Sequence, residues 1–169
     1  RFRPLLPDTG FLRLNDFEQL DLISDRTACV IIESIQGDAG IRIPEQQFLK
    51  ALRKKCDETG AMLIMDEIQS GIGRTGKLFA FEHFDVQPDI LCTAKALGGG
   101  LPLGAFIASK HHMDLFTAKP MLGHINTFGG NPVSCAAAVA TIKVILEGNF
   151  LTDVERKGAK FEKLINHRA

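Results

Sequence analysis

The sequence has no excess of charge of either sign and no long apolar run. Twenty Lys and Arg against 20 Asp and Glu give a formal net charge of zero at pH 7, so nothing in the balance favours a polyanionic partner such as nucleic acid. No apolar run approaches the roughly 20 residues of a membrane span, and the opening RFRPLLPDTG lacks the apolar core of a signal peptide. We therefore predict a soluble, cytoplasmic protein with a small, roughly neutral substrate and no nucleic-acid or membrane partner.

Closely spaced cysteine pairs are also absent. None of the cysteines forms the CxxC or CxxH pair that a local zinc site or a redox motif needs, and we predict no metal site. Three of them lie inside apolar runs, which favours buried, reduced thiols. The cysteines are Cys29, Cys56, Cys92 and Cys135, and the three in apolar runs are Cys29, Cys92 and Cys135.

The chain has 169 residues and 45% apolar content, enough for one domain with a sizeable core. Between the first two of its short apolar runs, Pro44 at a first helical position and Gly60 as a stop predict a helix with one buried stripe. Strands alternating with helices indicate an α/β fold with a largely parallel sheet. The predicted strands are 28–34, 61–67, 89–95 and 104–109, and the predicted stripe is Phe48, Leu49, Leu52 and Cys56.

The last third of the sequence is helical. Asn131 as a cap, Pro132 in the first turn and Gly148 as terminator delimit one helix. A second amphipathic helix starts at Phe150 and has no stop signal, and the first residues have no start-like character. We expect the polypeptide to continue beyond both ends.

The segment Met65–Leu78, MDEIQSGIGRTGKL, contains two glycine patterns of nucleotide-binding proteins. Its glycines spell GxGxxG, and Gly71–Lys77 spells GxxxxGK. In the dinucleotide fold the glycines follow the strand at once and a helix begins there, but here five residues intervene and Pro88 cuts off any following helix. A P-loop requires Ser or Thr where Leu78 stands, and its acidic strand should come later in the chain. The glycines are best explained as turn residues.

Asp66 and Lys95 end two successive predicted strands. In parallel sheets ligands bind at the carboxyl ends of strands, so a carboxylate and an amine would meet in one crevice. A role for Asp66 as a helix cap or loop ion-pair partner stays open. Lys95 follows a largely apolar run, and desolvation would make its amine a better nucleophile. The glycines at 98–100 would allow the backbone to approach a bulky group closely.

At this point a family resemblance is evident. LIMDEIQSGIGRTGKLFAFEHFDVQPDILCTAKALGGGLPLGA resembles the core of class III aminotransferases, fold type I enzymes that depend on pyridoxal phosphate (PLP). VIIESIQGDAGIRIP and HINTFGGNPVSCAAA are similar to two other blocks of that family, in the same order. The resemblance spans Ala28–Gly148 and is greatest to acetylornithine and ornithine aminotransferases. It implies a three-layer α/β fold, with residues 1–148 as part of the PLP-binding large domain and residues 149–169 as the start of the connection to a small C-terminal domain.

The resemblance also implies roles for individual residues. Lys95 would form the Schiff base with the cofactor aldehyde and then carry a proton between Cα and the cofactor. Asp66 would pair with the pyridine nitrogen, Ile68 would pack against the ring face, and Gln69 would bond the ring's phenolic oxygen. Thr127 matches a residue that reaches the phosphate of the partner's cofactor, which implies a homodimer.

Two acidic residues match the substrate side of the family's site. Glu33 corresponds to a glutamate at the active-site strand end, and Asp38 aligns with a gateway residue that ornithine-like members write as Glu. Ser34 stands where the family usually has Pro. Glu67 is expected to support the loop. The shorter Asp38 and Ser34 leave the identity of the substrate open.

The resulting hypothesis is PLP-dependent transfer of the terminal amino group of ornithine or acetylornithine to 2-oxoglutarate. Another ω-amino donor such as 4-aminobutyrate is an alternative, and a P-loop-like ATPase or a non-catalytic fragment are alternatives of another class. The family's phosphate-binding loop and its carboxylate-binding arginine find no match in these residues. We therefore expect the 169-residue chain to be inactive by itself.

Overall fold

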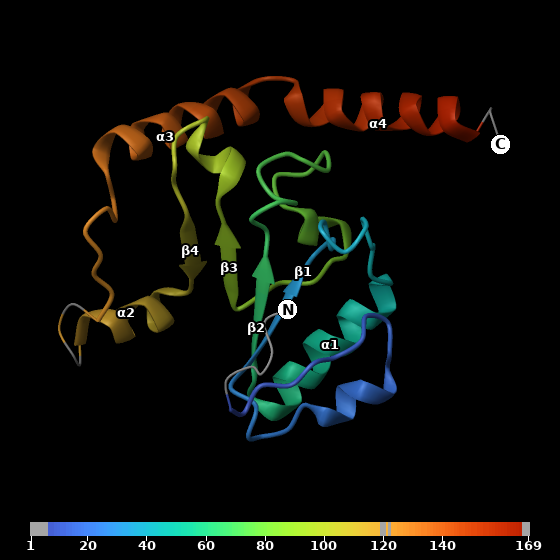
Figure 1. Ribbon diagram of the computed structural model, residues 1–169, viewed down its shortest axis with the longest axis vertical. Helices are drawn as coiled ribbons and strands as arrows, with labels where there is room; N and C mark the ends of the chain where they lie inside the picture. Colours follow the sequence, from blue (N-terminus) through green and yellow to red (C-terminus); the bar gives the residue numbers. More distant parts are fainter. Residues whose placement is uncertain (1–6, 119–120, 122, 167–169) are drawn as a thin grey trace.

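The structure is a computed structural model, which describes residues 7–118, 121 and 123–166. Its centre is a four-stranded sheet in the order β1-β2-β3-β4, with helices at its sides and across one end (Figure 1). The strands are β1 (Cys29–Glu33), β2 (Met62–Asp66), β3 (Ile90–Thr93) and β4 (Ala105–Ala108). The helices are α1 (Gln46–Thr59), α2 (Lys110–Ala118), α3 (Pro132–Glu147) and α4 (Phe150–Asn166), with 3₁₀ helices at Glu18–Leu22, Ala80–His83 and Lys95–Gly98.

The sheet confirms the predicted, mostly parallel α/β fold. β1, β2 and β3 are parallel, and only β4 runs in the opposite direction. Every predicted strand is present, with ends one or two residues shorter than expected. β3 stops at Thr93 because the next two residues leave the β region: Ala94 has φ −161° and ψ −145°, and Lys95 has φ 46°. Lys95 therefore begins a 3₁₀ helix instead of ending the strand.

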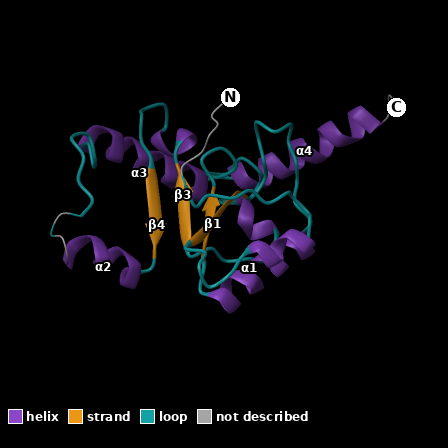
Figure 2. Cartoon of the chain, turned by 60° about the horizontal axis from the view of Figure 1, so that its bottom comes forward, coloured by secondary structure: helices purple, strands orange, loops and turns teal. Residues whose placement is uncertain are grey.

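Helix α1 covers one face of the sheet and supplies its core (Figure 2). All four residues of its predicted stripe are buried, and Gly60 ends the helix in the left-handed conformation with φ 76°. The predicted start at Pro44 was wrong. Glu45 is the N-cap residue and is still extended (ψ 136°), as N-cap residues usually are, and its backbone N–H donates to Asn15 Oδ1 at 2.9 Å, so the helix begins at Gln46. The stripe packs against Leu63, Met65 and Leu91 of the sheet.

The opposite face of the sheet is much more exposed than the apolar runs predict. We expected strands buried on both faces, but Ile31 on β1 is 63% exposed. The expectation of buried cysteines also fails. Cys29 on this face is exposed, Cys92 and Cys135 are half-buried, and only Cys56, on the inner side of α1, is buried. All four are free thiols, as predicted.

Helices α3 and α4 lie across the carboxyl end of the parallel strands (Figure 1). α3 begins as predicted, because the Asn131 side chain accepts from the backbone N–H groups of Val133 and Ser134. Gly148 ends it, and α4 follows at an angle of 66°. Among the described residues no single helix is long and apolar enough to cross a membrane, although α3 and α4 meet the length and composition criteria when taken together across their bend.

Candidate functional site

The predicted site residues on β1, β2 and the segment after β3 lie at one end of the sheet. Glu33 and Asp66 are partners in the β1–β2 register, and Asp66 and Cys92 are partners in the β2–β3 register. Lys95 comes three residues after Cys92. Since these strands are parallel, their carboxyl ends meet at the same edge, where α/β proteins bind their ligands. The register thus supports the prediction that β2 and β3 are adjacent and parallel, with Asp66 at the end of β2 and Lys95 two residues beyond the end of β3.

Asp66 has one carboxylate oxygen in use and one available. Its Oδ1 accepts the backbone N–H of Ile68 at 2.9 Å, which fixes the side chain, and no donor among the described residues reaches Oδ2. Burial raises the pKa of the neighbouring Cys92 thiol, and the charge of Asp66 raises it further. Asp66 therefore offers one carboxylate oxygen, held in place by its bond to Ile68, that can pair with a protonated nitrogen of a ligand.

Lys95 lies at the start of its 3₁₀ helix with a positive φ of 46°, which is uncommon for a residue with a side chain. Its Nζ donates a hydrogen bond to Gln69 Oε1. We expected a desolvated amine, but Lys95 is exposed in the described part of the chain. The glycines at 98–100 were expected to let the backbone approach a bulky group closely. In the structure the backbone at Gly99 lies close to α3, because a Cβ on Gly99 would be 2.2 Å from Thr141 Oγ1.

The Gln69 amide nitrogen lies against Gly37, a residue that the sequence did not indicate as part of the site. A Cβ added at Gly37 would lie 2.1 Å from Gln69 Nε2, so only glycine fits there without moving the amide. The Gly37 N–H in turn donates to Glu33 Oε2 at 2.9 Å. Glu33, Gly37, Gln69 and Lys95 therefore form a continuous chain of contacts. The QGDAG spacing after a strand is the signal that could have indicated it.

Asp38 and Thr127 lie outside this chain of contacts. Asp38 is exposed in the turn of a small hairpin closed by the Gln36–Arg42 bridge. Thr127 is exposed on the segment between α2 and α3, and among the described residues no hydrogen bond links it to the others. The structure thus brings together Glu33, Asp66, Ile68, Gln69 and Lys95, and places Asp38 on the adjoining hairpin.

The glycines that resembled nucleotide motifs form a turn that leads away from the site. Gly73 and Gly76 have φ of 82° and 91°, as expected for turn residues. Their neighbours are on α4: added Cβ atoms would meet Leu151 at 3.2 Å and Glu155 at 2.5 Å. Lys77 Nζ lies 3.8 Å from Glu155 Oε1. The lysine of the P-loop-like pattern therefore forms a surface ion pair.

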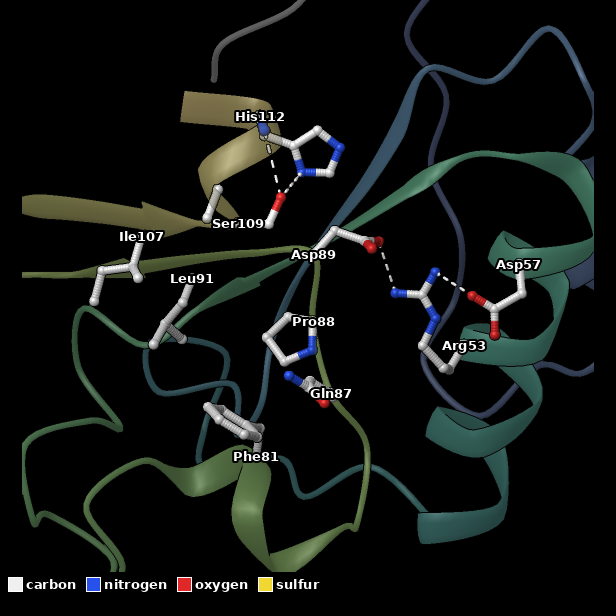
Figure 3. Close-up of a pocket in the computed structure, with 11 residues that line it drawn as sticks. Arg53, Asp57, Phe81, Gln87, Pro88, Asp89, Leu91, Ile107, Ser109 and His112 are labelled. Atoms are coloured by element: carbon white, nitrogen blue, oxygen red, sulfur yellow. Dashed lines mark hydrogen bonds and ion pairs between the residues drawn. The ribbon is translucent and has the colours of Figure 1, made fainter. Parts of the chain in front are cut away.

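A second concavity, of about 580 Å³, lies at the opposite end of the parallel strands (Figure 3). It is large enough for a small ligand but contains none of the predicted site residues. Arg53 lies between two carboxylates there, with 2.7 Å to Asp89 Oδ2 and 2.8 Å to Asp57 Oδ1. The charge of Arg53 is thus paired with two carboxylates of the protein itself. Among the described residues there is also no cluster of metal-ligating side chains.

Asp89 links α1 to β2 and is expected to stabilise the fold. Its Oδ2 accepts from both Arg53 Nη1 and Leu63 N at 2.7 Å. Burial acts to raise the pKa of Asp89, but the Leu63 N–H and the Arg53 guanidinium outweigh it and lower that pKa below its usual value. A lowered folded-state pKa means that the stabilisation is present above the unfolded-state pKa and is lost as the pH falls through the folded-state pKa.

We predict that Asp89→Asn lowers the free energy of unfolding of the complete protein by about 1–3 kcal/mol at neutral pH, and by less in acid. Urea unfolding at neutral and acidic pH measures the difference. Asp85→Asn is the control, because Asp85 is 86% exposed and pairs with Lys50 only at the surface. An equal loss for both variants, or a loss at Asp89 that does not depend on pH, would contradict the prediction.

Known proteins are similar to this chain in sequence and in fold. Residues 8–168 match the aminotransferase class-III family. The chain is 50% identical over 158 residues to the acetylornithine aminotransferase of Methanopyrus kandleri, covering 93% of this chain and 40% of that protein. It therefore spans well under half the length of that relative.

Solved structures agree with the sequence match. The ornithine aminotransferase of Toxoplasma gondii, whose active site is partially occupied by PLP, superposes with a TM-score of 0.90 at 35% identity, covering 99% of this chain and 39% of that one. The taurine:2-oxoglutarate aminotransferase of Bifidobacterium kashiwanohense, in complex with PLP and glutamate, gives 0.81 at 34% identity, covering 89% and 34%. The chain belongs to the class III aminotransferase family.

Proposed function

We propose that the complete protein transfers the terminal amino group of acetylornithine or ornithine to 2-oxoglutarate, with PLP as cofactor. The observation that carries this proposal is the meeting of Asp66, Gln69 and Lys95 at adjacent strand ends, with Lys95 bonded to Gln69. The choice of donor is supported by the 50% identical acetylornithine aminotransferase and by the ornithine aminotransferase structure.

The residues present fit PLP. Lys95 provides a primary amine for the aldehyde, Asp66 has an oxygen free for the ring nitrogen, and Gln69 carries an amide beside Lys95 for the ring oxygen. Ile68, half-buried next to Asp66, provides an apolar contact for the ring. Bound PLP supplies an acceptor for the electrons that a substrate Cα releases on deprotonation.

The chain's own residues then have distinct tasks. Asp66 keeps the ring nitrogen protonated, because a fixed carboxylate stabilises the positive charge there. Lys95 Nζ binds the cofactor and afterwards moves a proton to and from the substrate carbon. Glu33 and Asp38 act on the substrate side, where Gly37 connects Glu33 to Gln69.

The proposal includes an assembly. Thr127 binds the cofactor phosphate of a partner subunit in a homodimer, consistent with its exposure here. Residues 1–148 belong to the cofactor-binding domain and residues 149–169 to the connection toward a second domain. The protein acts in the cytoplasm.

A second candidate is transamination of another ω-amino donor, such as 4-aminobutyrate or taurine. The similarity to a taurine aminotransferase favours it, as does the shorter Asp38 at the gateway position.

A donor screen separates these candidates. The complete protein is supplied with PLP, 2-oxoglutarate and one donor at a time (acetylornithine, ornithine, 4-aminobutyrate or taurine), and glutamate formation is measured. We predict that kcat/KM for acetylornithine or ornithine exceeds that for 4-aminobutyrate and taurine by at least about tenfold, the range in which side-chain contacts discriminate between similar substrates. A preference for 4-aminobutyrate or taurine would support the second candidate, and no glutamate from any donor would refute both.

A further inference from the structure

Glu67 is a fully buried carboxylate that lies between Asp66 and Ile68 of the candidate site in the sequence. Its side chain is 0% exposed, and among the described residues no lysine, arginine or histidine pairs with it. Four donors surround it instead. Oε1 accepts from Ser34 Oγ and from the Phe81 N–H at 2.8 Å, and Oε2 accepts from Ser70 Oγ at 2.8 Å and from the Ala80 N–H at 3.0 Å. Four donors match the four lone-pair positions of an ionised carboxylate.

The arrangement requires a carboxylate and does not accept an amide. Each oxygen faces one hydroxyl, which can rotate to accept, and one backbone N–H, which can only donate. In Glu67→Gln, the new NH₂ group would face a backbone N–H in either orientation. One buried donor would lose its acceptor, and the segment would have to shift.

The donors of Glu67 come from three separate parts of the chain. Ser34 follows β1, Ser70 lies three residues after Glu67, and Ala80 and Phe81 begin the 3₁₀ helix beyond the glycine turn. The backbone of Glu67 is fixed as well, because its N–H donates to Cys92 O at 2.8 Å and its carbonyl accepts from Gly71 N at 3.0 Å. Glu67 thus joins the end of β1, the end of β3 and both ends of the glycine turn.

The cofactor-facing residues are the immediate neighbours of Glu67. Asp66 precedes it, and Ile68 and Gln69 follow it before the turn closes at Gly71. Gln69 has a side chain that reaches across to Lys95. The backbone of Gln69 lies between Glu67 and Ser70 in the sequence. The side chains of these two residues are hydrogen-bonded to each other and so restrict the position of Gln69.

We propose that Glu67 is a positioning residue: through its four buried hydrogen bonds it fixes segment 66–71 so that the Gln69 amide oxygen lies against Lys95 Nζ. This inference rests on the proposed PLP-dependent function. Glu67 acts through Gln69 and touches neither Lys95 nor a bound group. An oxygen held against Nζ stabilises a proton on that nitrogen, so Glu67 tunes the pH at which the nitrogen loses its proton.

The spectroscopic test uses the complete protein loaded with PLP. The pH at the midpoint of the change in visible absorption of the bound cofactor is measured for wild type and Glu67→Gln. We expect the midpoint to fall by about one pH unit in Glu67→Gln, the size of one lost hydrogen bond to a charged group. Ser34→Ala removes one donor and leaves the carboxylate, and is expected to shift the midpoint in the same direction by less.

Two comparisons separate positioning from a loss of stability. Glu82→Gln is the matched control, because Glu82 is an exposed carboxylate in the 3₁₀ helix Ala80–His83 and accepts one backbone N–H, from Phe79 at 2.8 Å. It should leave the midpoint unchanged. In a Gln69→Ala background, Glu67→Gln should produce no further shift, since the two residues act in series. The proposal would be overturned if Glu67→Gln shifted the midpoint equally in the wild-type and Gln69→Ala backgrounds. It would also be overturned if neither Glu67→Gln nor Ser34→Ala shifted the midpoint.

Crystal structures of wild type and Glu67→Gln give a readout that does not depend on the cofactor. The Gln69–Lys95 hydrogen bond is expected in wild type and should be broken in the variant. If it is retained, the proposal is wrong even if activity falls. If wild type binds no PLP, the proposed function fails, and the two structures alone decide whether Glu67 positions Gln69. Should Glu67→Gln not fold, Ser34→Ala supplies both measurements.

Discussion

Replacing Lys95 with alanine is expected to lower the kcat of transamination in the complete protein by about 10⁴- to 10⁶-fold, as removal of a covalent nucleophile does in other enzymes. Lys95 is assigned two tasks, attachment of the cofactor and proton transfer, and no other described lysine lies on the strand ends that form the site. Alanine is a better replacement than glycine here. Like lysine, alanine has a Cβ, so the cost of the backbone conformation at φ 46° stays the same in the variant. Steady-state glutamate formation measures the loss.

Borohydride reduction locates the attachment independently of turnover. Peptide mass mapping of the PLP-loaded protein should find the pyridoxyl group on Lys95, and none in the Lys95→Ala variant. Lys110→Ala is the control, because Lys110 is an exposed lysine paired with Asp114 on α2. An adduct at another lysine, or none in wild type, would remove the basis of the proposed function.

Replacing Asp66 with asparagine is expected to lower kcat by about 10²- to 10³-fold, the usual cost of removing one electrostatic contact to the reacting system. Asparagine has nearly the same shape and can still accept from the Ile68 N–H, but it has no charge to keep the ring nitrogen protonated. PLP should therefore still bind, while electron withdrawal from the substrate Cα becomes weak. Titration of PLP binding beside steady-state kinetics distinguishes the two effects.

Asp114→Asn is the control for that substitution, since Asp114 is an exposed carboxylate far along the chain from the site. If Asp66→Asn lost PLP affinity in proportion to activity, Asp66 would serve to hold the cofactor and not to activate it.

Most of the fold could be predicted because its signals are local. The buried stripe of α1, the left-handed Gly60 and the Asn131 cap each depend on residues within a few positions of one another, and all are present. The errors came from contacts distant in sequence. Glu45, predicted to be helical, is the extended N-cap residue of α1, and its N–H donates to Asn15, 30 residues earlier in the sequence. The apolar run of β1 predicted burial on both faces, but a run cannot indicate whether another element covers the second face.

The part of the site that lies at or just after strand ends could be predicted from the sequence. Asp66 and Lys95 follow from the rule that ligands bind where parallel strands end, and the family resemblance added Gln69. Glu67 and Gly37 were not identified as parts of the site, because their importance depends on three-dimensional contacts. Glu67 accepts from donors as far apart in sequence as Ser34 and Phe81, and a Cβ at Gly37 would displace the Gln69 amide from its present position. For Gly37 the QGDAG spacing after β1 is a signal in the sequence, whereas no periodicity or motif indicates the donors of Glu67.

At position 95 the residue types that the left-handed backbone prefers differ from the lysine that the proposed chemistry needs. At φ 46° a residue with a Cβ costs about 1 kcal/mol or more relative to glycine, and asparagine is the best tolerated alternative. Selection for stability alone would therefore favour glycine or asparagine at this position. A gene copy released from selection for catalysis would gain stability by that exchange, so glycine or asparagine at position 95 is the expected mark of a descendant that has lost the reaction and kept the fold.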